Sequence, residues 1–158
     1  MGKTTYFDTY WGEGWPSPDW LKGFFVAPKE QQWSYRDGNE SWRISIEGAE
    51  GTEQFEPTDP RRINIHLLMW GNSDLGVMLI YSKRGGGYKD IYNSKGDTLR
   101  LREHVRSLQD TPLPVGLFIP FDKAWPAVKE FMDTEGKLPK SIEWIPNEKL
   151  PPGTFSEP

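Results

Sequence analysis

The chain has 158 residues and a net charge of −4 at neutral pH, a length that suits a single domain (residues 1–158) with its own core. Aromatic residues make up 14% of the chain, too many for a disordered segment, and no apolar run reaches the roughly 18 residues that would cross a membrane. Cysteine is absent, which excludes disulfides, thiolate zinc sites and cysteine nucleophiles.

Residues 1–39 form a Trp-rich N-terminal region, for which we predict a short helix and a loop. Ser17 can cap the helix and Pro18 suits its first position. Four apolar residues then give the helix one apolar face: Trp20, Leu21, Phe24 and Phe25. We expect Trp20 to be buried, because few aliphatic residues are available to fill a core. The first residues lack the apolar segment of a secretory signal, so we expect a cytoplasmic protein.

Four strands are predicted in the middle of the chain. Apolar and polar residues alternate over 42–47, whereas 63–70 and 75–82 are more continuously apolar. A polar turn between the second and third segments makes them a hairpin. The Gly85-Gly86-Gly87 run then makes a tight connection to a fourth strand at 88–93.

A second helix is predicted at residues 123–133, after a short strand at 115–119. Asp122 is expected to cap it. Pro126 is expected in its first turn, where no intrahelical N–H bond is needed. Gly136 is typical of a helix end.

The remaining segments complete an α+β fold. Residues 98–108 fit either a strand or a helix, 142–145 are predicted as a last short strand, and 146–158 as an extended Pro-rich tail. This order indicates a mainly antiparallel sheet of about five to six strands with two to three helices packed on it.

No residue pattern is typical of a catalytic or metal site. His66 lies in an apolar strand and His104 in a basic segment, and neither has a second ligand at the spacing that zinc prefers. No Gly-x-Ser-x-Gly motif supports a serine nucleophile, although a Ser-His-Asp triad assembled by the fold stays open. We therefore predict a protein that is not an enzyme, with no catalytic residue, no metal and no cofactor.

Charge is unevenly distributed along the chain. Residues 1–60 carry −6, residues 61–106 carry +5 and residues 107–158 carry −3. Five acidic residues recur at every third position, namely Glu47, Glu50, Glu53, Glu56 and Asp59, and Gly and Pro between them predict a loop. Such a loop is either solvated surface or a complement to a cationic cleft of a partner. Neutralisation of the acidic segment by the basic one inside the fold is an equal alternative.

Two further features have functional and structural interpretations. Trp11 and Trp15 could anchor a partner or stack on sugars, or they could fill the core. The basic stretch 83–106 contains two Tyr residues, a pattern that can hold nucleic acid. The acidic pI of about 5.3 and the absence of a nucleic-acid motif argue against direct nucleic-acid binding.

The C-terminal third carries a resemblance to a known family. The segments are 113–120 (LPVGLFIP), 124–131 (AWPAVKEF) and 136–144 (GKLPKSIEW). They resemble the end of immunity protein family one of bacterial polymorphic toxin systems, in which a strand precedes an amphipathic helix that ends in an aromatic residue at the Phe131 position. A Pro at the Pro139 position and a Trp at the Trp144 position follow. The resemblance extends over residues 85–145 and, in pattern alone, over 40–82.

The resemblance implies a small cytosolic protein that binds and neutralises a cognate protein toxin by covering its active site. Many toxins of these systems resemble nucleic-acid deaminases, and others are nucleases. The expected partner-binding residues are the five acidic residues first, with Trp11 and Trp15 second. The alternatives are a carbohydrate- or ligand-binding module that uses the Trp-rich region, an enzyme with Glu47 and Glu50 near His66, and a nucleic-acid-binding protein.

Overall fold

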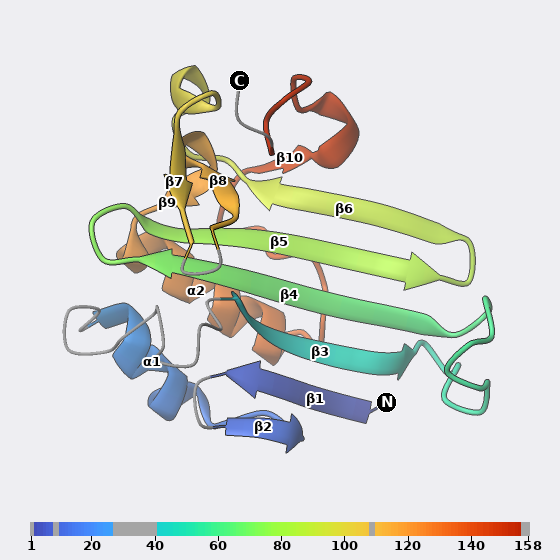
Figure 1. The fold of residues 1–158 in the computed structure, drawn as a ribbon. Helices are drawn as coiled ribbons and strands as arrows, with labels where there is room; N and C mark the ends of the chain where they lie inside the picture. Colours follow the sequence, from blue (N-terminus) through green and yellow to red (C-terminus); the bar gives the residue numbers. More distant parts are fainter. Residues whose placement is uncertain (1, 8–9, 27–40, 108–109, 156–158) are drawn as a thin grey trace.

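The computed structural model describes residues 2–7, 10–26, 41–107 and 110–155, and it has an α+β fold (Figure 1). The main sheet is antiparallel and eight-stranded. Seven of its strands follow one another in the order β10 (Trp144–Pro146), β6 (Tyr88–Ser94), β5 (Gly76–Gly85), β4 (Ile63–Asn72), β3 (Ser41–Ala49), β1 (Gly2–Phe7) and β2 (Tyr10–Glu13). The fold class is therefore confirmed, with more strands than the five to six predicted.

The four central strands match the prediction closely. Strands β3, β4, β5 and β6 are neighbours in the sheet as they are in the sequence. Gly86 and Gly87 form a two-residue turn with positive φ at both positions, the geometry of a type I′ hairpin. This turn sets the register of β5 and β6, so that Gly85 pairs with Tyr88 and Arg84 with Lys89.

The N-terminal hairpin of β1 and β2 was missed by the sequence analysis. Its residues are polar or mixed, so they lack the clear alternation that predicts a strand. Its single wholly buried side chain is Phe7, which packs edge-on against Phe24 and stacks on Trp42. The sheet therefore gains two strands from the Trp-rich region, of which residues 27–39 lie outside the described residues.

Helix α1 (Pro18–Val26) begins as predicted, and one of its residues does not lie as expected. The Ser17 hydroxyl accepts a hydrogen bond from the Trp20 backbone N–H, and Pro18 is the first helical residue. Trp20 is 38% exposed, so the prediction of burial is wrong. Its ring instead covers the outer side of Phe7 and Phe24, an arrangement that shields them while leaving one side of the indole in solvent.

Helix α2 (Phe121–Asp133) starts two residues before the predicted position. Pro120 is its N-cap, without a side-chain cap bond, so Asp122 lies inside the first turn, where its charge favours the helix dipole. Pro126 then falls beyond the first turn, where its missing N–H leaves the Asp122 carbonyl without its usual donor. The helix ends at Asp133 as predicted, and Gly136 after it has φ +94° and donates its backbone N–H to the Phe131 carbonyl.

The two faces of the sheet are covered differently. Both helices pack on one face, against residues such as Ile44, Leu67 and Tyr81, and Phe131 of α2 is fully buried there. Truncating a phenylalanine in such a position costs about 3–5 kcal/mol of stability. We call the opposite face the open face; it carries the alternate strand residues Tyr6, Trp11, Arg43, Glu47, Asn64, His66, Leu68, Arg84, Lys89 and Ile91.

One end of the open face has a small cover of its own. It consists of a two-stranded sheet, β7 (His104–Arg106) with β8 (Pro112–Pro114), and two 3₁₀ helices, η1 (Thr98–Arg100) and η2 (Val115–Leu117). Its apolar residues pack with Met78 in a second core cluster, and β9 (Phe118–Ile119) pairs with β5. Figure 1 shows this cover in front of the sheet and the helices behind it, with β1 and β3 uncovered by any described segment.

Three C-terminal predictions are resolved by this arrangement. The ambiguous stretch 98–108 contains both a 3₁₀ turn and a strand, and its last residue lies outside the described residues. The predicted strand at 115–119 is a 3₁₀ helix followed by a two-residue strand. The tail is not extended: η3 (Asn147–Lys149) and a turn fold it back, and the Thr154 carbonyl hydrogen-bonds His104. Residues 156–158 are not among those described.

Candidate functional site

The five acidic residues do not form one loop. Glu47 is half-buried in strand β3 and lies on the open face, whereas the other four belong to the connection between β3 and β4. We call residues 50–62 the acidic connection. The prediction of a loop is therefore correct for Glu50, Glu53, Glu56 and Asp59 and wrong for Glu47, which continues the period-two pattern of the strand.

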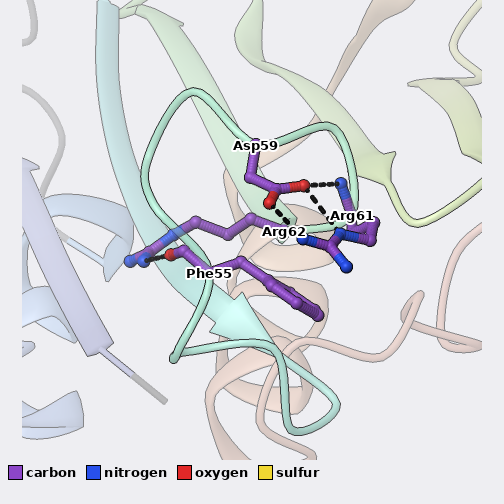
Figure 2. A network of polar contacts seen from close by, with 4 residues as sticks. All are labelled: Phe55, Asp59, Arg61 and Arg62. Atoms are coloured by element: carbon purple, nitrogen blue, oxygen red, sulfur yellow. Dashed lines mark hydrogen bonds and ion pairs between the residues drawn. The ribbon is translucent and has the colours of Figure 1, made fainter.

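Two arginines at its end order the acidic connection (Figure 2). The Asp59 carboxylate accepts hydrogen bonds from the backbone N–H, Nε and Nη2 of Arg61, at 2.9, 3.1 and 2.7 Å. These bonds lower the pKa of Asp59 to about 2. The Arg61 guanidinium also lies over the Phe55 ring, and Arg62 Nη1 donates to the Phe55 carbonyl at 2.8 Å.

A third cation pairs with the first residue of the connection. Lys83 Nζ lies 2.6 Å from a Glu50 carboxylate oxygen and 3.8 Å from the centre of the Tyr88 ring. Segments 1–60 and 61–106 therefore neutralise each other at two points, Glu50 with Lys83 and Asp59 with Arg61. This supports the alternative of contact within the fold for those two acids. Glu53 and Glu56 keep exposed side chains on the connection.

The two candidate Trp residues differ sharply in exposure. Trp11 is 72% exposed on edge strand β2, on the same face as Tyr6, its pairing partner. Trp15 packs on Phe131, and its Nε1 donates to the Ser45 carbonyl at 3.0 Å. Trp15 is thus packed against the core, whereas the exposed ring of Trp11 is available to contact a partner.

His66 occupies the middle of the open face. A 2.6 Å hydrogen bond joins its Nδ1 to the Ser45 hydroxyl. Burial lowers the pKa of His66, and the charge of Arg43 and, more weakly, of Arg84 lowers it further against the opposing effect of Glu47. The imidazole is therefore neutral at pH 7 and acts as a satisfied polar residue of the sheet.

The acid pair of the enzyme alternative is divided between the two faces. Glu47 lies beside His66, but the Glu50 carboxylate bonds Lys83 on the helix-covered side. A groove of about 530 Å³ there contains Glu50, Lys83, Asp90, Glu135 and Tyr81, and it does not include His66. Within the described residues, no group of three or more His, Asp or Glu side chains could hold a metal ion.

The residues that carry the family resemblance meet around Tyr81. The Tyr81 hydroxyl donates to the Gly136 carbonyl at 2.7 Å, and its ring contacts those of Phe131 and Trp144. Trp144 Nε1 in turn donates to the Pro139 carbonyl at 2.8 Å. Phe131 and Trp144, which are 13 positions apart in the pattern, therefore pack around Tyr81 and join helix α2 to the edge of the sheet.

A carboxylate of helix α2 completes this unit. Glu130 accepts hydrogen bonds from the backbone N–H groups of Lys140 and Ser141, at 2.6 and 3.1 Å, and these bonds lower the pKa of Glu130. The pattern thus marks a structural joint rather than a reactive site. In comparisons with known proteins, no family model, curated protein or solved structure matches the chain. Neither described helix is long and apolar enough to span a bilayer.

Sequence reasoning missed three cations on the open face, Arg43, Arg84 and Lys89. All three are exposed. Their common face follows from period-two alternation once the register is known, and the Gly86-Gly87 turn sets that register. The alternation is present in the sequence for Arg84 and Lys89, but a count of charge over 83–106 does not assign residues to faces.

Proposed function

We propose that this protein is an immunity protein that binds a cognate bacterial toxin and neutralises it by covering the active site. The observation that carries the proposal is the packed unit around Tyr81, in which the residues of the resemblance support one another. Mutually supportive contacts of this kind are what the fold implied by the resemblance requires of these residues, and the function is carried over from the resemblance. The proposed place of action is the cytoplasm, where the toxin would reach its target.

The proposed partner is a toxin domain that acts on nucleic acid. Such a domain needs a cationic cleft to hold phosphates, and exposed carboxylates on a rigid scaffold complement it. The exposed Glu53 and Glu56 of the acidic connection are the proposed contacts with that cleft, with Trp11 as an aromatic anchor. On this proposal the protein acts by binding alone and needs no cofactor.

The test is co-expression with the product of the adjacent gene, followed by purification of the complex and titration calorimetry. We expect the neighbour to stop growth when expressed alone, and growth to return when this protein is present. We also expect a stoichiometric complex of nanomolar affinity or tighter, about −12 kcal/mol or beyond. A neighbour that is harmless when expressed alone and does not bind would remove the proposed function.

The 72% exposure of Trp11 supports a second candidate, a carbohydrate-binding module. A sugar ring stacking on the exposed indole would change its fluorescence. Titration with a panel of glycans should then give a saturable change that Trp11→Ala abolishes and Trp15→Phe retains. The absence of any change would leave only the immunity proposal.

A further inference from the structure

Like charges lie opposite each other at the end of the β5–β6 hairpin. Arg84 and Lys89 are direct cross-strand partners on the open face, and both side chains are exposed. Like charges in directly opposed positions destabilise an antiparallel pair. Among the described residues, neither cation has an ion-pair partner.

The other face of the same hairpin is arranged in the opposite way. On each strand, the residue one position further from the turn points to the other face. These two residues, Lys83 and Asp90, are register partners, and Lys83 also forms an ion pair with Glu50. On the helix-covered side of this hairpin Lys83 thus has a counter-ion from this chain, whereas Arg84 and Lys89 on the open face have none among the described residues. Because Arg84 and Lys89 have no counter-ion in the described part of the chain while Lys83 does, the two open-face cations are suited to bind an anionic group of another molecule.

The two cations line a shallow pocket of about 650 Å³. Its wall includes Pro60 at the end of the acidic connection, and the Gly86 N–H donates to the Pro60 carbonyl at 2.8 Å. The basic pocket and the acidic connection are therefore neighbours on one end of the molecule. A partner that covers this end meets both signs of charge.

A row of residues of the types that dominate protein interfaces crosses the same face. Trp11, Tyr6 and Arg43 are successive register partners on strands β2, β1 and β3. Trp, Tyr and Arg are the residues most often found to carry binding energy, because they bury large areas and also make polar contacts. Half-buried Leu68 continues the row on β4.

We propose that the cognate toxin docks on the open face and places carboxylate side chains in the pocket of Arg84 and Lys89. The inference rests on the proposed function and adds the surface and the chemistry of the contact. Enzymes that act on nucleic acids hold catalytic or metal-binding carboxylates within a cationic cleft. The basic pocket faces such carboxylates, while the neighbouring acidic connection faces the cations around them.

Nucleic acid itself fits this face less well than a protein does. Two carboxylates, Glu13 and Glu47, share the face with the cations and would repel a phosphate backbone. A protein surface can present both signs in matching positions, which a nucleic-acid strand cannot. The occupant we infer is therefore the toxin and not its substrate.

The test compares variants of the protein for binding to the toxin domain that co-expression identifies. Arg84→Gln with Lys89→Gln removes the basic pocket, and Trp11→Ala removes the anchor. The matched control, Lys22→Gln with Lys123→Gln, removes two exposed cations from helices α1 and α2 on the covered side. We expect the pocket variant and Trp11→Ala each to weaken binding about tenfold or more, and the control to bind as the wild type does.

Folding stability separates a docking role from a structural one. Removing opposed like charges should leave the urea midpoint of the pocket variant unchanged or raise it. Wild-type affinity in both face variants would overturn the inference while the proposed function stands. So would binding of a single-stranded DNA oligonucleotide that only the pocket variant loses, with the toxin complex unaffected. A wild-type protein that binds no toxin would remove the proposed function and this inference with it.

Discussion

Gly85 and Gly87 have nearly equal φ angles but very different surroundings. Their φ values are +93° and +91°, yet a Cβ at residue 85 would lie 1.8 Å from the Arg62 carbonyl oxygen, whereas one at residue 87 would meet nothing within 4 Å. Gly85 thus allows the end of the acidic connection to approach the hairpin. The acidic connection and the basic pocket could not adjoin with a larger residue there.

Substituting these two glycines should separate strain from collision. Gly87→Ala places an L residue at positive φ and should cost about 1–2 kcal/mol of unfolding free energy. Gly85→Ala adds a clash with backbone that cannot rotate away, so its cost should be clearly larger. Urea denaturation of both variants measures the difference. Equal losses would mean that the Arg62 backbone moves freely and that the close approach is not required.

His66 should make folding stability depend on pH. Its pKa in the folded protein is lowered, by burial first and then by Arg43, so the unfolded chain binds a proton at higher pH than the folded chain does. The contribution of neutral His66 to the unfolding free energy is therefore fully present above the pKa of histidine in the unfolded chain, about 6.5, and it is lost as pH falls below that pKa. Denaturation midpoints at several pH values should decline on acidification, and His66→Asn, which retains a polar partner for Ser45, should flatten that decline. His104→Asn is the control, since an equal flattening there would assign the effect elsewhere.

Helix α2 illustrates how a boundary error changes the interpretation of a residue. The sequence suggested a start at 123, with Pro126 in a tolerant first turn, but the helix begins at Phe121. Asp122 is a residue type that often caps helices, and we predicted it as the cap. The N-cap is instead Pro120, which makes no side-chain hydrogen bond to the helix. Nothing local distinguishes the two positions, because the packing of the helix on the sheet determines where it starts.

The exposed Pro126 should therefore reduce the stability of helix α2. Pro126→Ala restores an N–H that can bond the Asp122 carbonyl and should raise the unfolding free energy by about 1–3 kcal/mol, less the entropy that proline removes from the unfolded chain. Pro120→Ala is the matched control. It should lower the unfolding free energy slightly, because the unfolded chain gains entropy while the N-cap gains no intrahelical hydrogen bond. A lower midpoint for Pro126→Ala would show that the helix is shaped around the proline ring.

Strands were predictable where one face is buried and where a turn is encoded locally. Strands β3 to β6 have strong alternation or apolar runs and glycine-rich turns, so both their existence and their order followed from the sequence. Strand β10 overlaps the strand predicted at 142–145. Strands β1, β2 and β8 were not predicted, although β2 pairs with the adjacent β1 and β8 with the nearby β7. Their own residues carry little periodicity, so only tertiary pairing defines them.

At the scale of the whole molecule, the candidate site was predictable in its residue types and not in its geometry. The acidic run was evident from spacing, but Lys83 and Arg61 come from other positions to neutralise Glu50 and Asp59. The cations of the open face were counted as part of a basic stretch, although alternation sends Lys83 and Arg84 to opposite sides of the sheet. Net charge along the chain therefore differs from the charge that a partner meets on one face.

This distribution decides which acids should steer a toxin towards the protein. Glu50 and Asp59 are paired, so their fields are partly cancelled and their replacement would also disturb the acidic connection. Glu53→Gln with Glu56→Gln removes two charges whose side chains are exposed. At low ionic strength this variant should associate with the toxin about threefold to tenfold more slowly than the wild type, because complementary charge mainly raises the association rate.

The difference in association rate between the wild type and the Glu53 and Glu56 variant should vanish near 1 M salt, where the Debye length falls to about 3 Å. The matched control is Asp74→Asn with Glu148→Gln, which removes two exposed carboxylates from the β4–β5 turn and from the segment after edge strand β10, both away from the acidic connection (Figure 1). Stopped-flow association at both ionic strengths gives the comparison. If the control slows association as much as the Glu53 and Glu56 variant, steering comes from net charge alone, and the acidic connection has no special part in recognition. If only the Glu53 and Glu56 variant is slow, the partner approaches at the end of the molecule where the acidic connection adjoins the pocket of Arg84 and Lys89.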